Sequence, residues 1–207
     1  MHRWSLFRSF RPIQFDQENL ERSTIAFRNE ITISSHRAGG SHVDVVWTEL
    51  KHREASQFHI LTVGDPEGGT VVLCRSYDSM SQFVLDWMQE HSKVVIYAIS
   101  LRQNMNSIYL LMNSMAKISF TLKTKDIFDN NLNEIKFDIV HDESTDVLQR
   151  IYNETGFKKE LFNRYLTYLQ VSKGVDTILS FDFTKNEIIT KDEQALINSI
   201  LDYKILK

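Results

Sequence analysis

The chain has 207 residues, of which 42% are hydrophobic and 25% are charged, the composition of an ordinary globular protein. Its net charge is -3, from 24 basic and 27 acidic residues, so nucleic acid is not an expected partner. Cys74 is the single cysteine, which excludes an intramolecular disulfide and a multi-thiolate zinc site. No apolar run approaches the roughly 20 residues of a membrane span. We therefore expect a soluble, cytoplasmic protein.

Two prolines and seven glycines, with no linker-like tract or repeat, predict a single domain over 1–207. Residues 1–15 form a basic and aromatic N-terminal arm that lacks acidic residues. It carries Arg3, Arg8 and Arg11 together with Trp4, Phe7 and Phe10. Two interpretations stay open: a targeting or membrane-surface segment, or an arm whose aromatic rings dock on the body of the protein while its arginines face water. We favour the second.

The first half of the chain has the patterns of a strand-rich sheet. Alternation of apolar and polar residues predicts strands over 24–34, 43–50, 57–63 and 70–76. The glycine- and proline-containing segment 64–69 predicts a hairpin between the last two of these strands.

Helices and strands alternate after residue 76. Ser79 and Gln82 fit a capping box before an amphipathic helix over 80–91. We then expect a strand over 93–100, a helix over 105–116, and strands over 118–123 and 135–140. The alternation over 70–123 permits a parallel crossover within the sheet.

Residues 144–207 are predicted to be helix-rich. One helix ends at Gly156, and a second, over 157–170, packs against it as an antiparallel pair. Strands over 175–183 and 187–189 precede a last helix, which a capping box of Thr190 and Glu193 opens. The predicted fold class is α+β: a mixed, largely antiparallel sheet with helices on one face and a C-terminal helical pair.

No glycine-rich dinucleotide fingerprint, phosphate-binding loop, serine-hydrolase elbow or zinc-protease motif occurs in the sequence, so no cofactor is predicted. Asp44 with Glu49-Leu50-Lys51 resembles the Asp…Glu-x-Lys signature of the PD-(D/E)XK nuclease family. The resemblance implies two metal-binding carboxylates and a lysine that positions the attacking water. On one strand, however, Asp44 and Glu49 would point to opposite faces, about 16 Å apart. A metal-dependent nuclease or related hydrolase is therefore the alternative hypothesis, and a solvated charged turn the simpler interpretation.

Other polar residues carry weaker signals. Four histidines, at positions 36, 42, 52 and 59, fall in the predicted first sheet, but their spacing does not require a zinc site. We therefore predict no metal site. Cys74 is expected to be a small buried apolar residue within a strand, because no nearby cation would lower the pKa of its thiol.

Aromatic residues are abundant in the second half of the chain. On the predicted helix over 157–170 they surround more of the circumference than one packing face needs. They are Phe157, Phe162, Tyr165 and Tyr168. Either these rings fill a large core, or some form an exposed contact surface. Our preferred hypothesis is a non-enzymatic protein-binding module, such as a complex subunit, an inhibitor or an immunity-type protein. It would use the C-terminal helices or a sheet edge to bind another protein or a second copy of itself.

Overall fold

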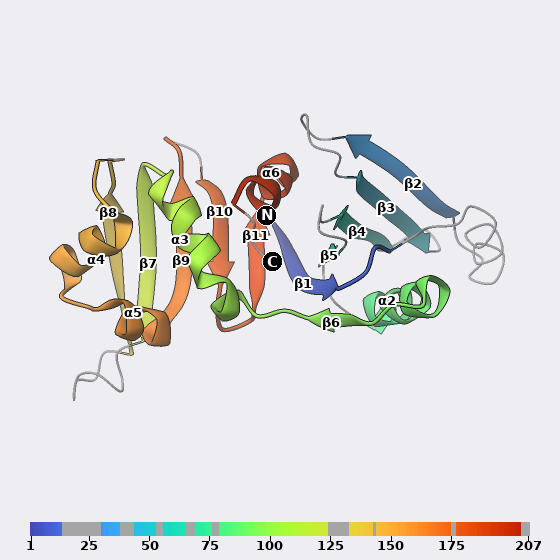
Figure 1. The fold of residues 1–207 in the computed structure, drawn as a ribbon, viewed down its shortest axis with the longest axis horizontal. Helices are drawn as coiled ribbons and strands as arrows, with labels where there is room; N and C mark the ends of the chain where they lie inside the picture. The colour runs from blue at the N-terminus through green and yellow to red at the C-terminus, as the bar shows by residue number, and fades with distance from the viewer. Residues whose placement is uncertain are drawn as a thin grey trace. The chain divides into compact units, whose positions relative to one another are not determined.

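The computed structural model describes residues 1–13, 30–37, 44–52, 56–64, 69–75, 79–123, 133–142, 144–174 and 177–203. The chain forms two compact units (Figure 1). The N-terminal unit is His2–Ile99, and the C-terminal unit is Ser100–Lys207 together with Met1. Antiparallel strands and helices make up each unit, so the predicted α+β class is confirmed. The expectation of a single domain stays a prediction.

The N-terminal unit contains an antiparallel sheet in the order β2-β3-β4-β5-β1. Its elements are β1 (His2–Ser9), β2 (Glu30–Arg37), β3 (Asp44–His52), β4 (Ser56–Gly64), β5 (Thr70–Arg75), α2 (Ser79–Ser92) and β6 (Ile96–Ala98). The predicted hairpin of β4 and β5 is confirmed, as is the helix before β6. Positions 24–29 of the first predicted strand lie outside the described residues.

β1 pairs with a strand on each edge. Phe7 is opposite Val72 of β5 and also opposite Ala98 of β6, so β5 and β6 flank β1. Both run antiparallel to β1 and are therefore parallel to each other, with α2 as the connection between them. The permitted parallel crossover is thus present, but with β1 between its two parallel strands.

The predicted N-terminal arm is a strand of this sheet, which corrects the expectation of a docked arm. Trp4 and Leu6 are buried, and Phe7 packs against the core cluster that contains Val72 and Met88. Only part of the docking interpretation applies, because the side chain of Phe10 is 75% exposed. A strand that hydrogen-bonds on both edges satisfies its backbone far better than a docked arm could.

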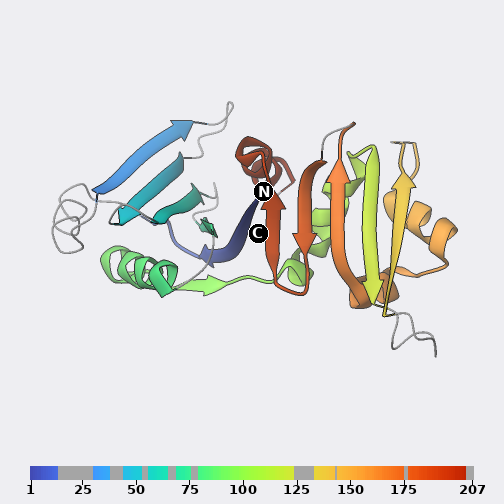
Figure 2. The ribbon, with the colours of Figure 1, turned by 180° about the vertical axis from the view of Figure 1, so that it is seen from behind.

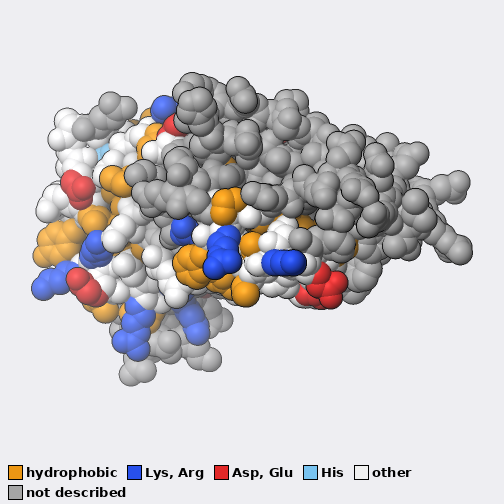
Figure 3. All heavy atoms as spheres, turned by 45° about the vertical axis from the view of Figure 1, so that its right-hand side comes forward, with side chains coloured by type: hydrophobic (Ala, Val, Ile, Leu, Met, Phe, Trp, Pro, Cys, Tyr) orange, Lys and Arg blue, Asp and Glu red, His pale blue; other side chains and the backbone are white. Residues whose placement is uncertain are grey.

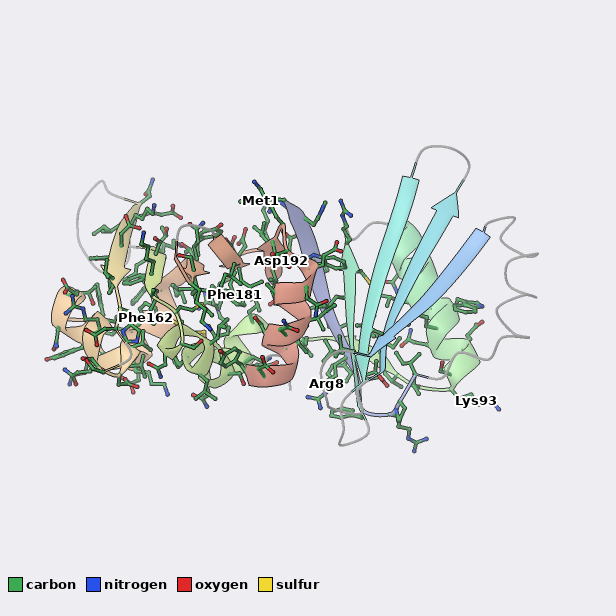
Figure 4. The ribbon with its side chains drawn as sticks, turned by 90° about the horizontal axis from the view of Figure 1, so that it is seen from above. Met1, Arg8, Lys93, Phe162, Phe181 and Asp192 are labelled. Atoms are coloured by element: carbon green, nitrogen blue, oxygen red, sulfur yellow. The ribbon has the colours of Figure 1, made fainter. Side chains whose placement is uncertain are left out.

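The C-terminal unit has a sheet in the order β11-β10-β9-β7-β8. Each pair of neighbouring strands in this sheet is antiparallel. Figures 1 and 4 show its helices on one face, and Figure 2 shows the other face from behind. Its elements are η1 (Leu101–Asn104), α3 (Met105–Asn113), β7 (Lys117–Lys123), β8 (Glu134–Val140), α4 (Val147–Thr155), α5 (Lys159–Tyr165), β9 (Leu166–Ser172), β10 (Thr177–Asp182), β11 (Glu187–Thr190) and α6 (Glu193–Tyr203).

The core of this unit lies between the sheet and the helices. Along β7, Ile118, Phe120 and Leu122 are buried, whereas the alternate residues are partly or fully exposed. The ring of Phe120 stacks on Phe137 at 5.1 Å and meets Phe162 edge-on at 5.0 Å. Figure 4 labels Phe162 of α5 and Phe181 of β10, which are both fully buried. This period-two burial is what one helix-covered face requires.

The prediction of a helix over 157–170 is wrong. The helix α5 ends at Tyr165, and Leu166 begins β9, which pairs with both β7 and β10. The guanidinium of Arg102 donates to the carbonyl oxygens of Asn163 and, at 2.8 Å, Leu166. These bonds satisfy carbonyls at the end of the helix that a continuing helix would have used itself. The stretch 144–207 therefore contains three strands besides its helices.

Helix ends elsewhere follow local rules. Asp146 accepts from the amide of Leu148 at the start of α4, and Gly156 ends that helix with φ of 74°, as predicted. The last helix begins later than expected. The carboxylate of Asp192 accepts from the amide of Ala195 at 3.0 Å, whereas the hydroxyl of Thr190 accepts from Asp192. Asp192, not Thr190, therefore caps α6. No helix in the described part of the chain is long and apolar enough to cross a membrane.

Replacing Arg102 with Ala tests how much this side chain holds the transition from α5 to β9. Loss of two charge-assisted hydrogen bonds should lower the free energy of unfolding in urea by about 2–3 kcal/mol. The control is Gln103→Ala, an exposed neighbour on η1, with an expected change within about 0.5 kcal/mol. Equal unfolding midpoints for the two variants would contradict this role.

Candidate binding surface

An exposed aromatic and basic surface lies where β1 ends beside β6. We call it the β1–β6 patch and define it as Arg8, Phe10, Val95 and Tyr97. Phe10 and Val95 are 75% and 73% exposed. The rings of Phe10 and Tyr97 stack with centroids 4.9 Å apart, and the guanidinium of Arg8 lies over the Phe10 ring at 5.9 Å. Phe10 and Val95, two of the most exposed apolar side chains described, are therefore both linked to Tyr97: Phe10 through the ring stack, and Val95 as the residue two positions earlier in the chain.

Strand pairing explains why these side chains share a face. Arg8 is directly opposite Tyr97 in the β1–β6 ladder, so the two side chains point to the same side. Their neighbours Phe7 and Ile96 pack on the opposite side, against a core cluster that includes Leu85 and Met88 of α2. Alternation thus puts Phe7 and Ile96 under α2 and Arg8 and Tyr97 on the other face, where Trp4 and Leu6 earlier in β1 are buried and Phe10 is exposed.

The segment that carries Phe10 is held at several points. The amide of Arg11 donates to the hydroxyl of Ser9 at 3.2 Å, and the amide of Ile13 donates to the hydroxyl of Thr70 at 3.1 Å. Ile13 also packs against the α2 core cluster. Phe10 is therefore held outside the core by its own backbone.

The segment that carries Val95 is fixed by Gln89. Its carbonyl accepts from the amide of Val94 at 3.3 Å, and its side-chain oxygen accepts from the amide of Ile96 at 2.9 Å. Lys93 has φ of 50°, so the chain leaves α2 through a left-handed residue in a Schellman-type ending. Val94 turns inward and is 8% exposed, which leaves the next residue, Val95, outside.

The surroundings of the patch are basic. Residues 2–13 and 93–99, the two segments that meet here, contain Arg3, Arg8, Arg11 and Lys93 and no acidic residue. The nearest acid along α2 is the exposed Glu90. Figure 3 shows Lys and Arg side chains, together with acidic ones, beside hydrophobic side chains on the described part of one face, and Figure 4 shows Arg8 and Lys93 apart from each other. Two exposed cations, Arg11 and Lys93, thus lie on the described segments that carry the patch.

The four aromatic residues expected to bind a partner do not form one surface. Phe162 is fully buried, and Tyr168 lies on the central strand β9 opposite Thr121 and Asp182. Phe157 and Tyr165 are half-buried on either end of α5. Tyr165 is the last residue of the short helix α5. The same helix contacts α3 through a hydrogen bond between Asn163 of α5 and Tyr109 of α3.

Exposed apolar side chains of the C-terminal unit are distributed over separate elements. Leu110 of α3 is 59% exposed, Val140 of β8 is 72% exposed, and Tyr152 and Leu161 lie on α4 and α5. Only one of these four side chains, Tyr152, is aromatic, so they cannot form a ring stack like that of Phe10 and Tyr97. The N-terminal unit therefore carries the better organised surface.

The residues of the alternative nuclease hypothesis share one strand. Asp44, Glu49 and Lys51 all lie on β3, with Glu49 opposite Thr32 and His59 in the flanking strands. Their side chains lie outside the description, so the hypothesis stays untested. His36, His52 and His59 are on β2, β3 and β4, and position 42 lies outside the described residues. Within the described residues, no three His, Cys, Asp or Glu side chains gather as a metal site would need.

A polar cluster joins α3 to α5. The hydroxyl of Tyr109 donates to the side-chain oxygen of Asn163, and the amine of Lys159 donates to that of Asn106 at 3.2 Å. The same amine lies 5.2 Å from the centroid of the Tyr109 ring. Burial raises the pKa of Tyr109 above its ordinary value. The phenol therefore stays a neutral hydrogen-bond donor, which fits a structural role.

His141 is the most unusual buried polar residue described. Its side chain is 4% exposed, and neither ring nitrogen has a hydrogen-bond partner in the described structure. Its backbone amide donates to the carbonyl of Ala116 at 2.9 Å, which fixes the end of β8 against the start of β7. Backbone pairing thus places this imidazole in the interior, where its nitrogens bring a desolvation cost.

The sequence has no detected relatives that would add to this geometry. No protein-family model matches the chain, and no curated protein sequence matches it at a significant level.

The buried thiol of Cys74 supports a prediction about reactivity. The prediction that Cys74 is buried is confirmed, and desolvation raises its pKa from 9.0 to about 12. A thiol-reactive disulfide reagent at pH 8 should therefore modify the protein only as fast as it unfolds. Because the folded-state pKa is raised, this group's contribution to stability is complete below pH 9 and is lost as the pH rises toward 12. Rapid stoichiometric modification of the native protein would show that the thiol is accessible.

Replacing His141 with Leu should stabilise the protein. The change removes two unpartnered buried nitrogens at similar volume, so we expect a gain of about 1 kcal/mol, seen as a rise of about 2–4 °C in Tm. His141→Gln is the control, since it keeps a buried polar group and should bring no gain. A clear loss of stability in the Leu variant would mean that the imidazole makes a polar interaction in solution.

Proposed function

We propose that the chain is a protein-binding module whose contact surface is the β1–β6 patch. The observation that carries this proposal is the exposure of Phe10 and Val95, which stand beside the stacked ring of Tyr97 instead of entering the adjacent core. This surface replaces the one expected on residues 157–170, because Phe162 of that segment is buried.

The chemistry of the patch suits a protein interface. Aromatic and arginine side chains are enriched at the centre of such interfaces and supply most of the binding energy. Full burial of an exposed apolar side chain such as Val95 or Phe10 contributes roughly 1.5–3 kcal/mol. The Phe10–Tyr97 stack and the fixed backbone on either side reduce the number of conformations that a partner must select.

The sequence offered part of this signal. Arg8 and Phe10 belong to the basic and aromatic segment that composition alone distinguishes. Val95 and Tyr97 lie in a continuous apolar run, where nothing in the pattern shows which residues face out. Only the register of β6 against β1 brings the two pairs together.

The test is size-exclusion chromatography with mass measurement on protein isolated from its native cells. We compare the wild type with a Phe10→Ser/Val95→Ser variant. The control, Leu110→Ser/Val140→Ser, also removes two strongly exposed apolar side chains. We expect a co-eluting partner, or a mass of twice 24.3 kDa if the partner is a second copy. The patch variant should bind that partner at least about tenfold more weakly, and the control should bind it normally.

Two results would contradict the proposal. One is a wild-type protein that elutes alone at its monomer mass. The other is a partner whose binding survives the patch substitutions, whether or not the control substitutions weaken it.

A further inference from the structure

We infer that the β1–β6 patch binds an extended, acidic segment of a partner protein, which adds to the free edge of β6 as a further strand. This inference rests on the proposed function and specifies the chemistry of the partner. Three observations support it: the outer backbone groups of β6, the exposed cations Arg11 and Lys93, and the small size of the apolar surface.

The backbone of β6 offers hydrogen-bonding groups on its outer edge. The amide of Ile99 donates to the carbonyl of Leu6 at 3.1 Å, which makes these two residues a hydrogen-bonded pair of the β1–β6 ladder. Because such pairs alternate, Arg8 and Tyr97 form the next one, and the backbone groups of Ile96 and Ala98 point away from β1.

Only part of this outer edge is already satisfied. The side chain of Gln89 accepts from the amide of Ile96, which leaves the carbonyl of Ile96 and both backbone groups of Ala98. Within the described residues β6 pairs with β1 alone, and Ala98 is exposed. An incoming strand can therefore form about two or three backbone hydrogen bonds, the usual basis of strand addition.

The charge of the patch specifies an acidic occupant. Arg11 and Lys93, both exposed, lie on the two segments that meet here, and these segments carry no acid. Carboxylates on an added strand would approach these cations, and the attraction would raise the association rate and exclude basic segments.

The extent of the surface fits a short segment better than a folded domain. A standard interface takes roughly 20–30 residues from each partner. Here the apolar part consists of Phe10, Val95 and Tyr97 beside a strand of three residues. A single-stranded nucleic acid is less well matched, because the Phe10 ring already contacts Tyr97 and Arg8 and base stacking needs a free ring face.

The experiment selects phage-displayed random twelve-residue peptides on the immobilised full-length chain. We expect the selected peptides to be rich in Asp, Glu and apolar residues. The synthesised consensus peptide should bind the Arg11→Glu/Lys93→Glu variant at least tenfold more weakly than the wild type. It should bind the control, Lys117→Glu/Lys185→Glu, normally, since that variant makes the same change of charge at two exposed lysines of the C-terminal unit.

Two further changes test strand addition itself. Ala98→Pro removes one outward amide from an edge strand, a position where proline is tolerated. Folding of this variant is checked by circular dichroism. N-methylation of alternate peptide amides removes the partner groups without changing the chain at all. Each change should weaken binding at least fivefold.

The outcomes separate this inference from the proposed function. Selected peptides without acidic enrichment, or binding unaffected by peptide N-methylation, would overturn the inference. So would patch-dependent binding to phosphatidylserine vesicles with no selected peptide. In the first two cases, a native partner that still depends on Phe10 and Val95 would leave the proposed function intact. If neither the native partner nor the selected peptides lose affinity when Phe10 and Val95 are replaced, both proposals are contradicted.

Discussion

The pairing of β1 on both edges is the constraint on which the candidate surface depends. Once residues 4–9 pair with β5 and residues 7–9 also pair with β6, alternation decides the face to which each of their side chains points. Phe7 must enter the core beneath α2, and Arg8 must face the other way, opposite Tyr97. An aromatic and basic surface follows from an ordinary sheet, without strain in either strand.

The ending of α2 supplies the second half of that surface. Gln89 uses its carbonyl and its side chain on the amides of Val94 and Ile96, and Lys93 adopts a left-handed conformation between them. These contacts decide which residues of the segment that leads into β6 point inward and which point outward. A shift of one residue would bury Val95 and expose Val94 and Ile96, which belong to the interior.

Much of the fold could be predicted from local patterns, because alternation and capping are local. The strands β3, β4, β5 and β7 and the helices α2 and α4 were predicted with small errors at their ends. The predictions failed where a residue distant in the sequence decides whether a helix ends and a strand begins. Leu166 and Leu169 fit a helical period, yet Arg102, more than sixty residues earlier, donates to the carbonyl oxygen of Leu166, where α5 ends and β9 begins. Burial along β9 does alternate from Thr167 to Val171, but the aromatic Tyr168 on its partly exposed face hides this alternation in the sequence.

The candidate surface was predictable in composition but not in location. The residues 1–15 are visibly basic and aromatic, but the partner of Phe10 is Tyr97, and no local pattern joins positions so far apart. The burial of Phe162 could not be predicted for the same reason, since its ring contacts come from Phe120 and Tyr109 on other elements.

Methyl NMR of Val95 tests the central claim most directly. With a soluble gadolinium chelate present, the Val95 methyl signals of the free protein should broaden strongly, whereas those of the buried Val72 should not. In the complex purified from native cells, the Val95 signals should become protected. Protection of Val95 in the free protein, or unchanged broadening in the complex, would contradict the account.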